Sequence, residues 1–229
     1  MQKLLAIAVA VLVAHSAWAQ GTRRFAVIAG NDDGGEGTRP LLYARDDARK
    51  IHDILTRLGG IQPPDSELVL NGKAADVLAA FTRIEQRLQQ AAERSERTAL
   101  LFYYSGHAKD GAMRLGSTAL AFDSLRNWLA QSRADVRIGI FDSCRSGALT
   151  RSKGARKAPS FEVESDAGRG AKGLVILASS AADEDSQESD QIGGSYFSHH
   201  LASGLLGDAD RSGDGRVTLS EAYAYAYER

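Results

Sequence analysis

Residues 99–108 read ALLFYYSGHA and residues 136–147 read VRIGIFDSCRSG, and these two stretches decide the fold. Each starts with a run of apolar and aromatic residues, which is typical of a β-strand buried on both faces. Each then changes to small and polar residues that include a glycine, where the backbone can turn sharply. Together with similar apolar runs, they predict strands at Phe25–Ala29, Glu67–Leu70, Ala99–Tyr104, Val136–Phe141 and Leu174–Ala178.

Amphipathic helical stretches alternate with these strands. Apolar residues at helical spacing predict helices at Ala44–Leu58, Ala74–Arg94, Ser124–Gln131 and Ser195–Leu206, and a short hairpin is expected at Met113–Leu120. The alternation predicts an α/β fold, a three-layer sandwich whose mostly parallel central sheet of about six strands carries helices on both faces. Residues 147–172 interrupt it, because they are rich in Ser, Gly, Lys and Arg without periodicity, and we expect a mobile loop there.

The composition limits the class of protein. The chain has 229 residues, a formal net charge of −1 and a single cysteine. A chain of this length buries enough surface to form one globular domain. Its near-zero charge offers no electrostatic attraction to nucleic acid, so we expect no nucleic-acid partner. One cysteine also excludes an internal disulfide and a cysteine-rich metal cluster.

The first residues predict export. Residues 1–19 contain Lys3, an apolar run from Leu4 to Val13 and the triplet AWA at 17–19, which together are typical of a secretory signal peptide. The apolar run is shorter than the roughly 20 residues of a spanning helix, and an uncleaved membrane anchor is the alternative. We expect a mature domain at residues 20–229 that is periplasmic or secreted and has no membrane span once the signal is removed.

His107 and Cys144 lie just past the ends of the two strands quoted first. Chemistry in parallel sheets gathers at the carboxyl ends of the strands, so the imidazole and the thiol face each other if the two strands are neighbours. An adjacent imidazole lowers the pKa of a thiol and later protonates the leaving group, which suits the pair to nucleophilic catalysis. The alternative is a buried structural cysteine.

The motifs YYSGHA at 103–108 and FDSCRSG at 141–147 resemble the paired catalytic motifs of the caspase-like cysteine peptidases, nearest to the metacaspase and bacterial branches. The resemblance runs from Phe25 to about Leu206. It implies a caspase-type fold in which Cys144 is the nucleophile and His107 the general acid and base. It also implies an oxyanion site made by the backbone amides of Cys144 and Ala108, although family members usually carry glycine where this chain has Ala108.

The same resemblance implies a pocket for an arginine or lysine side chain, formed by Asp47, Ser105 and Asp142. Paired carboxylates favour a cation and reject an acidic side chain, so we expect a peptide or protein substrate with Arg or Lys at the cleavage site. Three alternatives stay open. Asp142 could merely cap the turn after its strand, Asp47 could merely complement the helix dipole, and Asp46 could take the place of Asp47.

A basic cluster follows the proposed nucleophile. It consists of Arg151, Lys153, Arg156 and Lys157. An enzyme that cuts after basic residues could cleave its own chain here, so we predict self-cleavage between Arg151 and Lys157. The alternative is a solvated basic loop that is never cut.

Residues 210–221 follow the pattern of a twelve-residue EF-hand-like calcium loop, with glycine at its sixth position. The expected oxygen ligands are Asp210, Ser212, Asp214, the carbonyl of Arg216, a water near Thr218 and bidentate Glu221. The family resemblance suggests that calcium could also activate the enzyme. EF-hand loops usually occur in pairs, and the sequence contains no second such loop. The alternative is a polar turn that joins two helices without a metal.

Two other functions are compatible with the sequence. A catalytically silent caspase-like module could use the basic loop and the calcium loop to bind proteins. A thiol redox sensor would need a resolving cysteine, and the sequence has no second cysteine. The presence of both His107 and Cys144 favours the enzyme.

Overall fold

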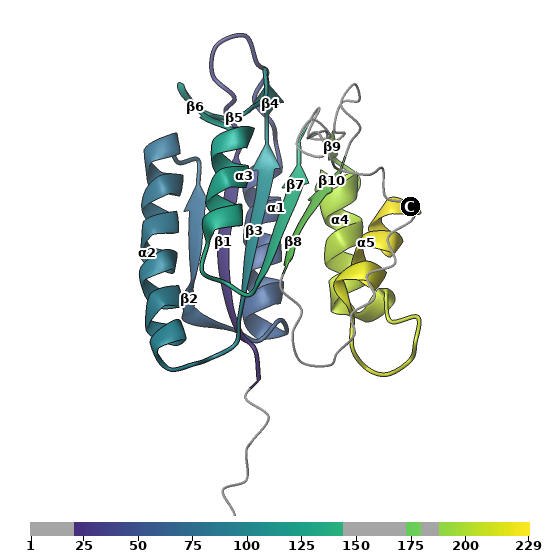
Figure 1. Ribbon diagram of the computed structural model, residues 1–229. Coiled ribbons are helices and arrows are strands. Elements are labelled where there is room, and N and C mark those ends of the chain that lie inside the picture. Colours follow the sequence, from purple (N-terminus) through teal and green to yellow (C-terminus); the bar gives the residue numbers. More distant parts are fainter. Residues whose placement is uncertain (1–20, 144–172, 180–187) are drawn as a thin grey trace, which may run out of the picture.

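The computed structural model describes residues 21–143, 173–179 and 188–229. Through this part of the chain runs a central sheet of five strands, all parallel, in the order β2-β1-β3-β7-β8 (Figure 1). Its strands are β1 (Arg23–Asn31), β2 (Ile61–Leu70), β3 (Thr98–Gly106), β7 (Val136–Asp142) and β8 (Gly173–Ala178). The predicted strands are confirmed, with five in the described sheet where about six were expected.

Helices cover both faces of the sheet, as the α/β pattern predicts (Figure 1). One face packs against α2 (Ala74–Glu93) and α3 (Phe122–Gln131). The other face packs against α1 (Ala44–Arg57), α4 (Tyr196–Ser203) and α5 (Leu219–Tyr227). The chain is therefore a three-layer α/β sandwich.

The helix predicted just before the expected calcium loop, residues 210–221, is shorter than the sequence suggests. The periodicity predicts one helix to Leu206, whereas α4 ends at Ser203 and a single π-helical turn, Gly204–Asp208, follows. Gly207 in this turn has a φ of 127°, which a residue with a side chain rarely adopts. The helical path therefore ends here and the chain turns toward α5.

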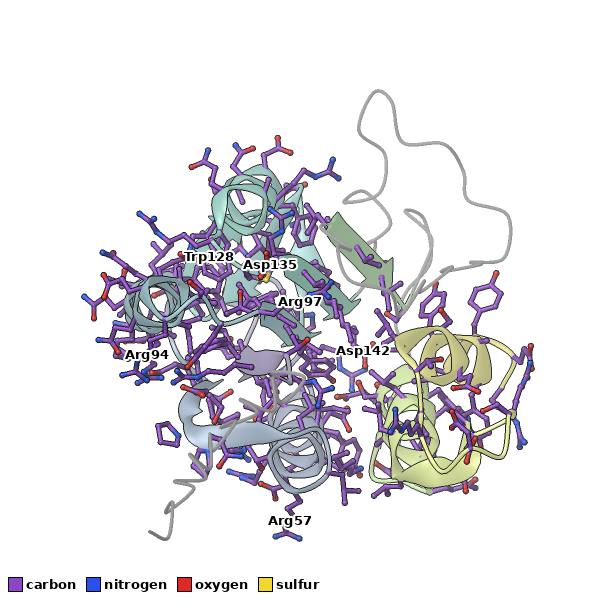
Figure 2. The ribbon with its side chains drawn as sticks, turned by 60° about the horizontal axis from the view of Figure 1, so that its bottom comes forward. Arg57, Arg94, Arg97, Trp128, Asp135 and Asp142 are labelled. Atoms are coloured by element: carbon purple, nitrogen blue, oxygen red, sulfur yellow. The ribbon has the colours of Figure 1, made fainter. Side chains whose placement is uncertain are left out.

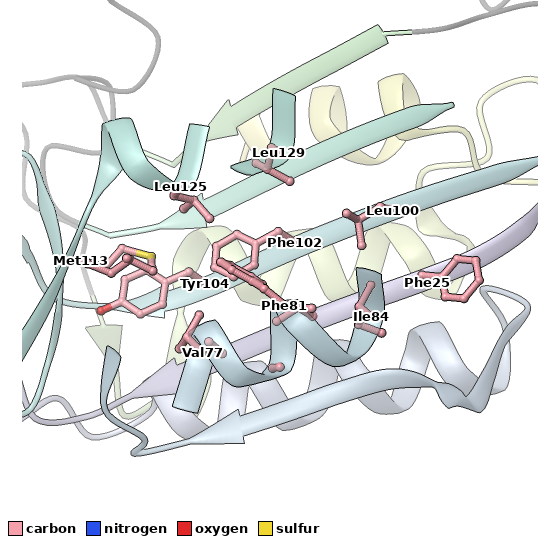
Figure 3. Close-up of a cluster of buried hydrophobic side chains, with 14 of the residues drawn as sticks. Phe25, Val77, Phe81, Ile84, Leu100, Phe102, Tyr104, Met113, Leu125 and Leu129 are labelled. Carbon is pink, nitrogen blue, oxygen red and sulfur yellow. The ribbon is translucent and has the colours of Figure 1, made fainter. Parts of the chain in front are cut away.

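The core on the α2 and α3 side combines aromatic rings with aliphatic side chains (Figure 3). Phe81 of α2 stacks on Trp128 of α3 with ring centroids 3.7 Å apart, and it meets Phe102 of β3 edge-on at 5.4 Å. Successive side chains of a strand point to opposite faces. Phe102 accordingly lies in this layer, while its neighbour Tyr103 lies in the layer beneath α1 and α4.

Short antiparallel strands extend the carboxyl edge of the sheet. Beyond β3, a small sheet is formed by β4 (Ala108–Lys109), β5 (Ala112–Leu115) and β6 (Thr118–Ala121). The predicted hairpin is confirmed here. A second hairpin, β9 (Glu188–Ser189) with β10 (Gly194–Ser195), directly precedes α4.

The second hairpin is hydrogen-bonded to the chain just before α1. The first N–H groups of a helix have no partner within it, and the residue that precedes α1, Tyr43, provides no side-chain cap. The carboxylate of Asp32 takes that role, because its Oδ1 accepts the backbone N–H of Arg45 at 2.9 Å. The carboxylate of Glu188 in β9 accepts hydrogen bonds from the backbone N–H groups just before the helix, those of Leu42 at 2.9 Å and Tyr43 at 3.0 Å. The hydroxyl of Tyr43 donates in turn to Asp190 at 2.8 Å. These bonds hold the β9–β10 hairpin against α1.

Across the described residues, no helix combines the length and apolar character needed to cross a bilayer.

Candidate active site

The carboxyl ends of β3 and β7 lie side by side. The two strands are neighbours, and Ser105 of β3 stands opposite Asp142 of β7 in the ladder. His107 follows β3, and Ser143, which is fully buried, follows β7. The neighbouring strands expected for the imidazole and the thiol are therefore present. Cys144 itself lies outside the described residues.

The imidazole of His107 is held by the segment that follows β1. Its Nε2 lies 2.8 Å from the backbone carbonyl oxygen of Arg39. A carbonyl only accepts hydrogen bonds, so Nε2 carries the proton and donates it. In the neutral ring Nδ1 is then the basic nitrogen, as a general base requires.

The same segment fixes the position of the ring and of the histidine backbone. A Cβ atom added to the buried Gly34 would lie 2.6 Å from Cδ2 of His107, so only glycine lets the chain lie this close to the imidazole. The carbonyl of His107 accepts hydrogen bonds from the Tyr104 hydroxyl and the Arg114 amide, both at 2.8 Å. His107 is thus fixed at both its side chain and its backbone.

Ala108, predicted to provide an oxyanion amide, begins β4 and stands opposite Met113 of β5. Its backbone follows directly on that of His107. Its partner in that prediction, the amide of Cys144, lies outside the described residues, so the oxyanion site stays a prediction.

Two carboxyl side chains are buried on the α1 and α4 side of the same edge. Asp47 of α1 has 0% of its surface exposed. Asp142, at the end of β7 and labelled in Figure 2, has 2% of its surface exposed. Asp46 is instead about half exposed and pairs with Arg49 at 2.7 Å. Of the two candidates on α1, Asp47 is therefore the one that lies with Asp142 and the buried Ser105.

The start of α4 connects the two carboxylates. The backbone N–H of Ser195 donates to Oδ2 of Asp47 at 2.9 Å, and its hydroxyl donates to Oδ2 of Asp142. The hydroxyl of Ser198 donates to the same oxygen of Asp142. The hydroxyl of Tyr103 lies 2.5 Å from the Ser198 oxygen.

Burial makes the negative charge of Asp47 costly. Removal from water raises the pKa of Asp47 to about 7, the Ser195 N–H opposes the rise, and the nearby charge of Asp142 adds to it. Among the described residues, no group donates a hydrogen bond to Oδ1 of Asp47. The ammonium nitrogen of Lys50 lies 3.9 Å from that oxygen. Within the described part of the chain, one carboxylate oxygen of Asp47 is thus buried and without a hydrogen-bond donor.

Room beside Asp47 depends on a glycine. A Cβ atom added to Gly194 would lie 2.6 Å from Oδ1 of Asp47. Any larger residue at this position of β10 would press on the carboxylate.

A comparison with protein-family models identifies the family. The model described as the caspase domain matches residues 23–220, which include β1, every residue of the site above and the start of α5. The chain belongs to the caspase-domain family. No curated protein matches its sequence.

Membership in the caspase-domain family agrees with the predicted caspase-type fold and indicates cysteine-peptidase chemistry in general. Such peptidases act on peptides or proteins.

Sequence reasoning missed the side chains that hold the acidic pair, Tyr103, Ser195 and Ser198. One signal for them exists in the sequence: two serines three residues apart at the start of a helix are typical of a helix cap. The hydroxyl of Ser195 does cap α4, since it accepts the backbone N–H of Ser198 at 3.0 Å. The side-chain bonds to Asp142 could not be read from local spacing, because β7 and α4 are distant in sequence.

In the predicted calcium loop of the caspase domain, the backbone wraps around Asp210. Its carboxylate accepts N–H groups from Gly213 at 2.8 Å, Asp214 at 3.2 Å and Gly215 at 2.9 Å. Partial burial opposes ionisation of Asp210, but the N–H groups of Gly215 and Gly213 outweigh it and lower its pKa. The loop is thus folded around an ionised carboxylate.

The other end of the loop is part of a helix cap. The carboxylate of Glu221 accepts the N–H and the hydroxyl of Thr218, both at 2.8 Å, and these bonds lower its pKa. The donor set offers the oxygens that calcium prefers, and Asp210 is close enough to Glu221 for their charges to repel. In the part of the chain that the structure describes, however, no three acidic, histidine or cysteine side chains gather as a metal-binding group.

Proposed function

We propose that this caspase domain is a cysteine-type endopeptidase that hydrolyses peptide bonds after arginine or lysine. The family supports the peptidase chemistry. The observation that carries the specificity is the pair of buried carboxylates, Asp47 and Asp142, with one oxygen of Asp47 lacking a hydrogen-bond donor among the described residues.

A basic side chain of the substrate completes this pair. A guanidinium or ammonium group supplies N–H donors to Oδ1 of Asp47 and a positive charge between two negative ones. A substrate aspartate would add a third negative charge to a site already costly to ionise, and it is rejected. Ser105, at the edge of the same pocket, lines it with a short polar side chain.

In the proposed mechanism, Nδ1 of His107 accepts the proton of the Cys144 thiol, and the thiolate attacks the carbonyl carbon of the substrate. The amides of Ala108 and Cys144 stabilise the oxyanion. His107 then gives the proton to the leaving amine, which departs and leaves an acyl-enzyme. A water molecule, deprotonated by His107, hydrolyses the thioester and restores the thiol.

A panel of fluorogenic peptides with Arg, Lys or Asp before the scissile bond tests this function. We expect cleavage after Arg and Lys, none after Asp, and loss of cleavage in Cys144→Ala and His107→Ala. Asp47→Asn should raise KM at least tenfold, since a hydrogen bond to a charged group contributes about 1.5–3 kcal/mol. Asp46→Asn, one residue away and exposed, is the matched control and should match the wild type. Cleavage after Asp, or activity that survives Cys144→Ala, would overturn the proposal.

We also propose self-cleavage between Arg151 and Lys157, a segment that lies outside the described residues. The four basic residues there are substrates of the proposed specificity. Incubation of the purified wild type should produce new N-termini in this segment, and Cys144→Ala should stay intact. A wild-type chain that stays intact with calcium present contradicts this part of the proposal.

A further proposal is that loop 210–221 binds calcium and that the metal regulates the enzyme. Support comes from the oxygen donor set and from the loop backbone already wrapped around Asp210. Asp210, Asp214 and Glu221 would provide the charged ligands, and the metal would stiffen the connection between α4 and α5. Calorimetry with millimolar calcium should show binding that Asp214→Ala removes and Asp208→Ala, just outside the loop, retains. Absence of heat in the wild type would exclude the site.

Residues 1–19 support the proposal that the protein is exported. This segment lies outside the described residues. Fractionation of expressing cells, followed by N-terminal sequencing, should find a chain that begins at Gln20 outside the cytoplasm. A chain that retains residues 1–19 would contradict it.

A further inference from the structure

The first turn of α4 approaches both acids of the proposed pocket. Ser195 contributes its backbone N–H to Asp47 and its hydroxyl to Asp142, and Ser198 contributes a second hydroxyl to Asp142. We propose that Ser195 and Ser198, supported by Tyr103, are the positioning residues that keep this acidic pair ionised and oriented for a basic side chain. The inference rests on the proposed function and names the residues on which its specificity depends.

The hydrogen bonds have one consistent direction. The backbone N–H of Ser198 donates to the Ser195 hydroxyl oxygen, and that hydroxyl gives its own hydrogen to Asp142. The Ser198 hydroxyl also gives its hydrogen to Asp142, so the Tyr103 hydroxyl must be the donor in its contact with Ser198. The two serine hydroxyls therefore both donate to Oδ2 of Asp142, and the Tyr103 hydroxyl supports one of them from behind. Donors to the charged oxygen favour a carboxylate over a carboxylic acid.

These donors oppose two effects that would otherwise neutralise the pocket. Burial of Asp47 and the nearby charge of Asp142 both favour the protonated form of Asp47. Hydrogen bonds to the charged form and the positive end of the α4 dipole favour the ionised forms. The groups that bear on this balance are Asp47 and Lys50 of α1, Asp142 of β7, Tyr103 of β3 and Glu188 of β9.

A neutral pocket would bind a cation weakly, so the hydroxyls determine affinity. Removing the Ser198 hydroxyl takes one charge-assisted hydrogen bond from Asp142 and also removes the oxygen that the Tyr103 hydroxyl contacts. The backbone N–H of Ser198, which completes the cap of α4, remains. The change therefore affects the pocket more than the helix.

The test is binding of agmatine, an amine that carries the arginine side chain, to full-length protein with Cys144→Ala, which excludes self-cleavage. We expect Ser198→Ala to weaken binding by about tenfold or more near neutral pH, and by more at about pH 6 than at about pH 8. Ser198→Thr retains a hydroxyl and should bind within about twofold of the parent. Ser203→Ala, at the other end of α4, is the matched control and should bind like the parent.

If Ser198→Ala fails to fold, as judged by circular dichroism, Tyr103→Phe replaces it. That variant keeps the buried ring and removes only the hydroxyl that donates to Ser198, and we expect weaker binding with the same pH trend. Equal binding by Ser198→Ala and Ser203→Ala, or no agmatine binding by the parent, would overturn the inference. Agmatine binding without hydrolysis of any peptide by the wild type would instead refute the peptidase function and leave the inference standing.

Discussion

Replacing Asp47 with asparagine tests whether this pocket lowers the stability of the fold in exchange for cation binding. Burial raises the pKa of Asp47 to about 7 in the folded protein, whereas an aspartate in an unfolded chain titrates near 3.9. The folded state therefore binds more protons than the unfolded state between these values. The contribution of Asp47 to stability is fully present below about pH 4 and is lost as the pH rises toward about 7.

The pKa shift sets the size of the effect. A pKa difference of one unit corresponds to about 1.4 kcal/mol, so the full loss reaches about 4 kcal/mol above neutral pH. About 2.5 kcal/mol of it falls between pH 5 and pH 8. Asparagine does not ionise, and its amide oxygen can still accept the N–H of Ser195. Relative to the parent protein, Asp47→Asn should therefore gain about 2.5 kcal/mol of unfolding free energy over this interval.

Urea unfolding followed by circular dichroism measures this difference, with all proteins carrying Cys144→Ala. Subtracting the parent from the variant at each pH cancels the groups that titrate in both. Asp46→Asn, which changes the exposed neighbouring carboxyl, is the control and should not show this gain. The same Asp47→Asn protein should no longer bind agmatine. A stability difference that is flat from about pH 5 to about pH 8 would refute the reasoning.

Two further substitutions test other parts of the structure. Gly34→Ala places a Cβ atom 2.6 Å from the His107 ring. We expect kcat for an arginine peptide to fall at least tenfold, while the melting temperature stays within a few degrees. An unchanged kcat would show that the ring tolerates displacement. Arg23→Ala removes hydrogen bonds of 2.8 Å and 2.9 Å to the buried Asp65. In urea unfolding, it should lower the free energy of unfolding by about 2 kcal/mol. Arg24→Ala removes a hydrogen bond to an exposed carbonyl and should lower this free energy by less than about 1 kcal/mol. Equal losses in the two arginine variants would contradict the role of the Asp65 pair.

The sequence was sufficient to predict the sheet and its functional edge because parallel strands buried on both faces are continuous apolar runs. β3 is such a run and β7 is one apart from Arg137 near its start, and their ladder brings Ser105 opposite Asp142. The helices over the faces were predicted for the same reason, from apolar residues repeated at helical spacing. Boundaries were less certain, since the turn after Ser203 depends on backbone conformation at Gly207.

The support of the site could not be predicted, because it joins segments far apart in the chain. Glu188 of β9 binds the backbone just before α1, and the carbonyl of Arg39 positions the imidazole of His107. A carboxylate that binds a distant backbone segment has no local spacing that would reveal it. A sequence pattern cannot predict which backbone carbonyl binds a side chain, since every residue has a carbonyl. Chemistry-bearing residues are thus easier to find in a sequence than the groups that hold them.

Adjacent tyrosines of β3 support the two halves of the site. Tyr103 points to the α1 and α4 layer, where its hydroxyl reaches Ser198 and, through it, Asp142. Tyr104 points to the opposite layer, where its hydroxyl donates to the carbonyl of His107. Because side chains alternate along a strand, one strand can brace the specificity pocket with one residue and the catalytic base with the next. The distance from the acidic pair to the imidazole is then fixed by the backbone of β3, which is buried in the middle of the sheet and cannot shift without disturbing both cores.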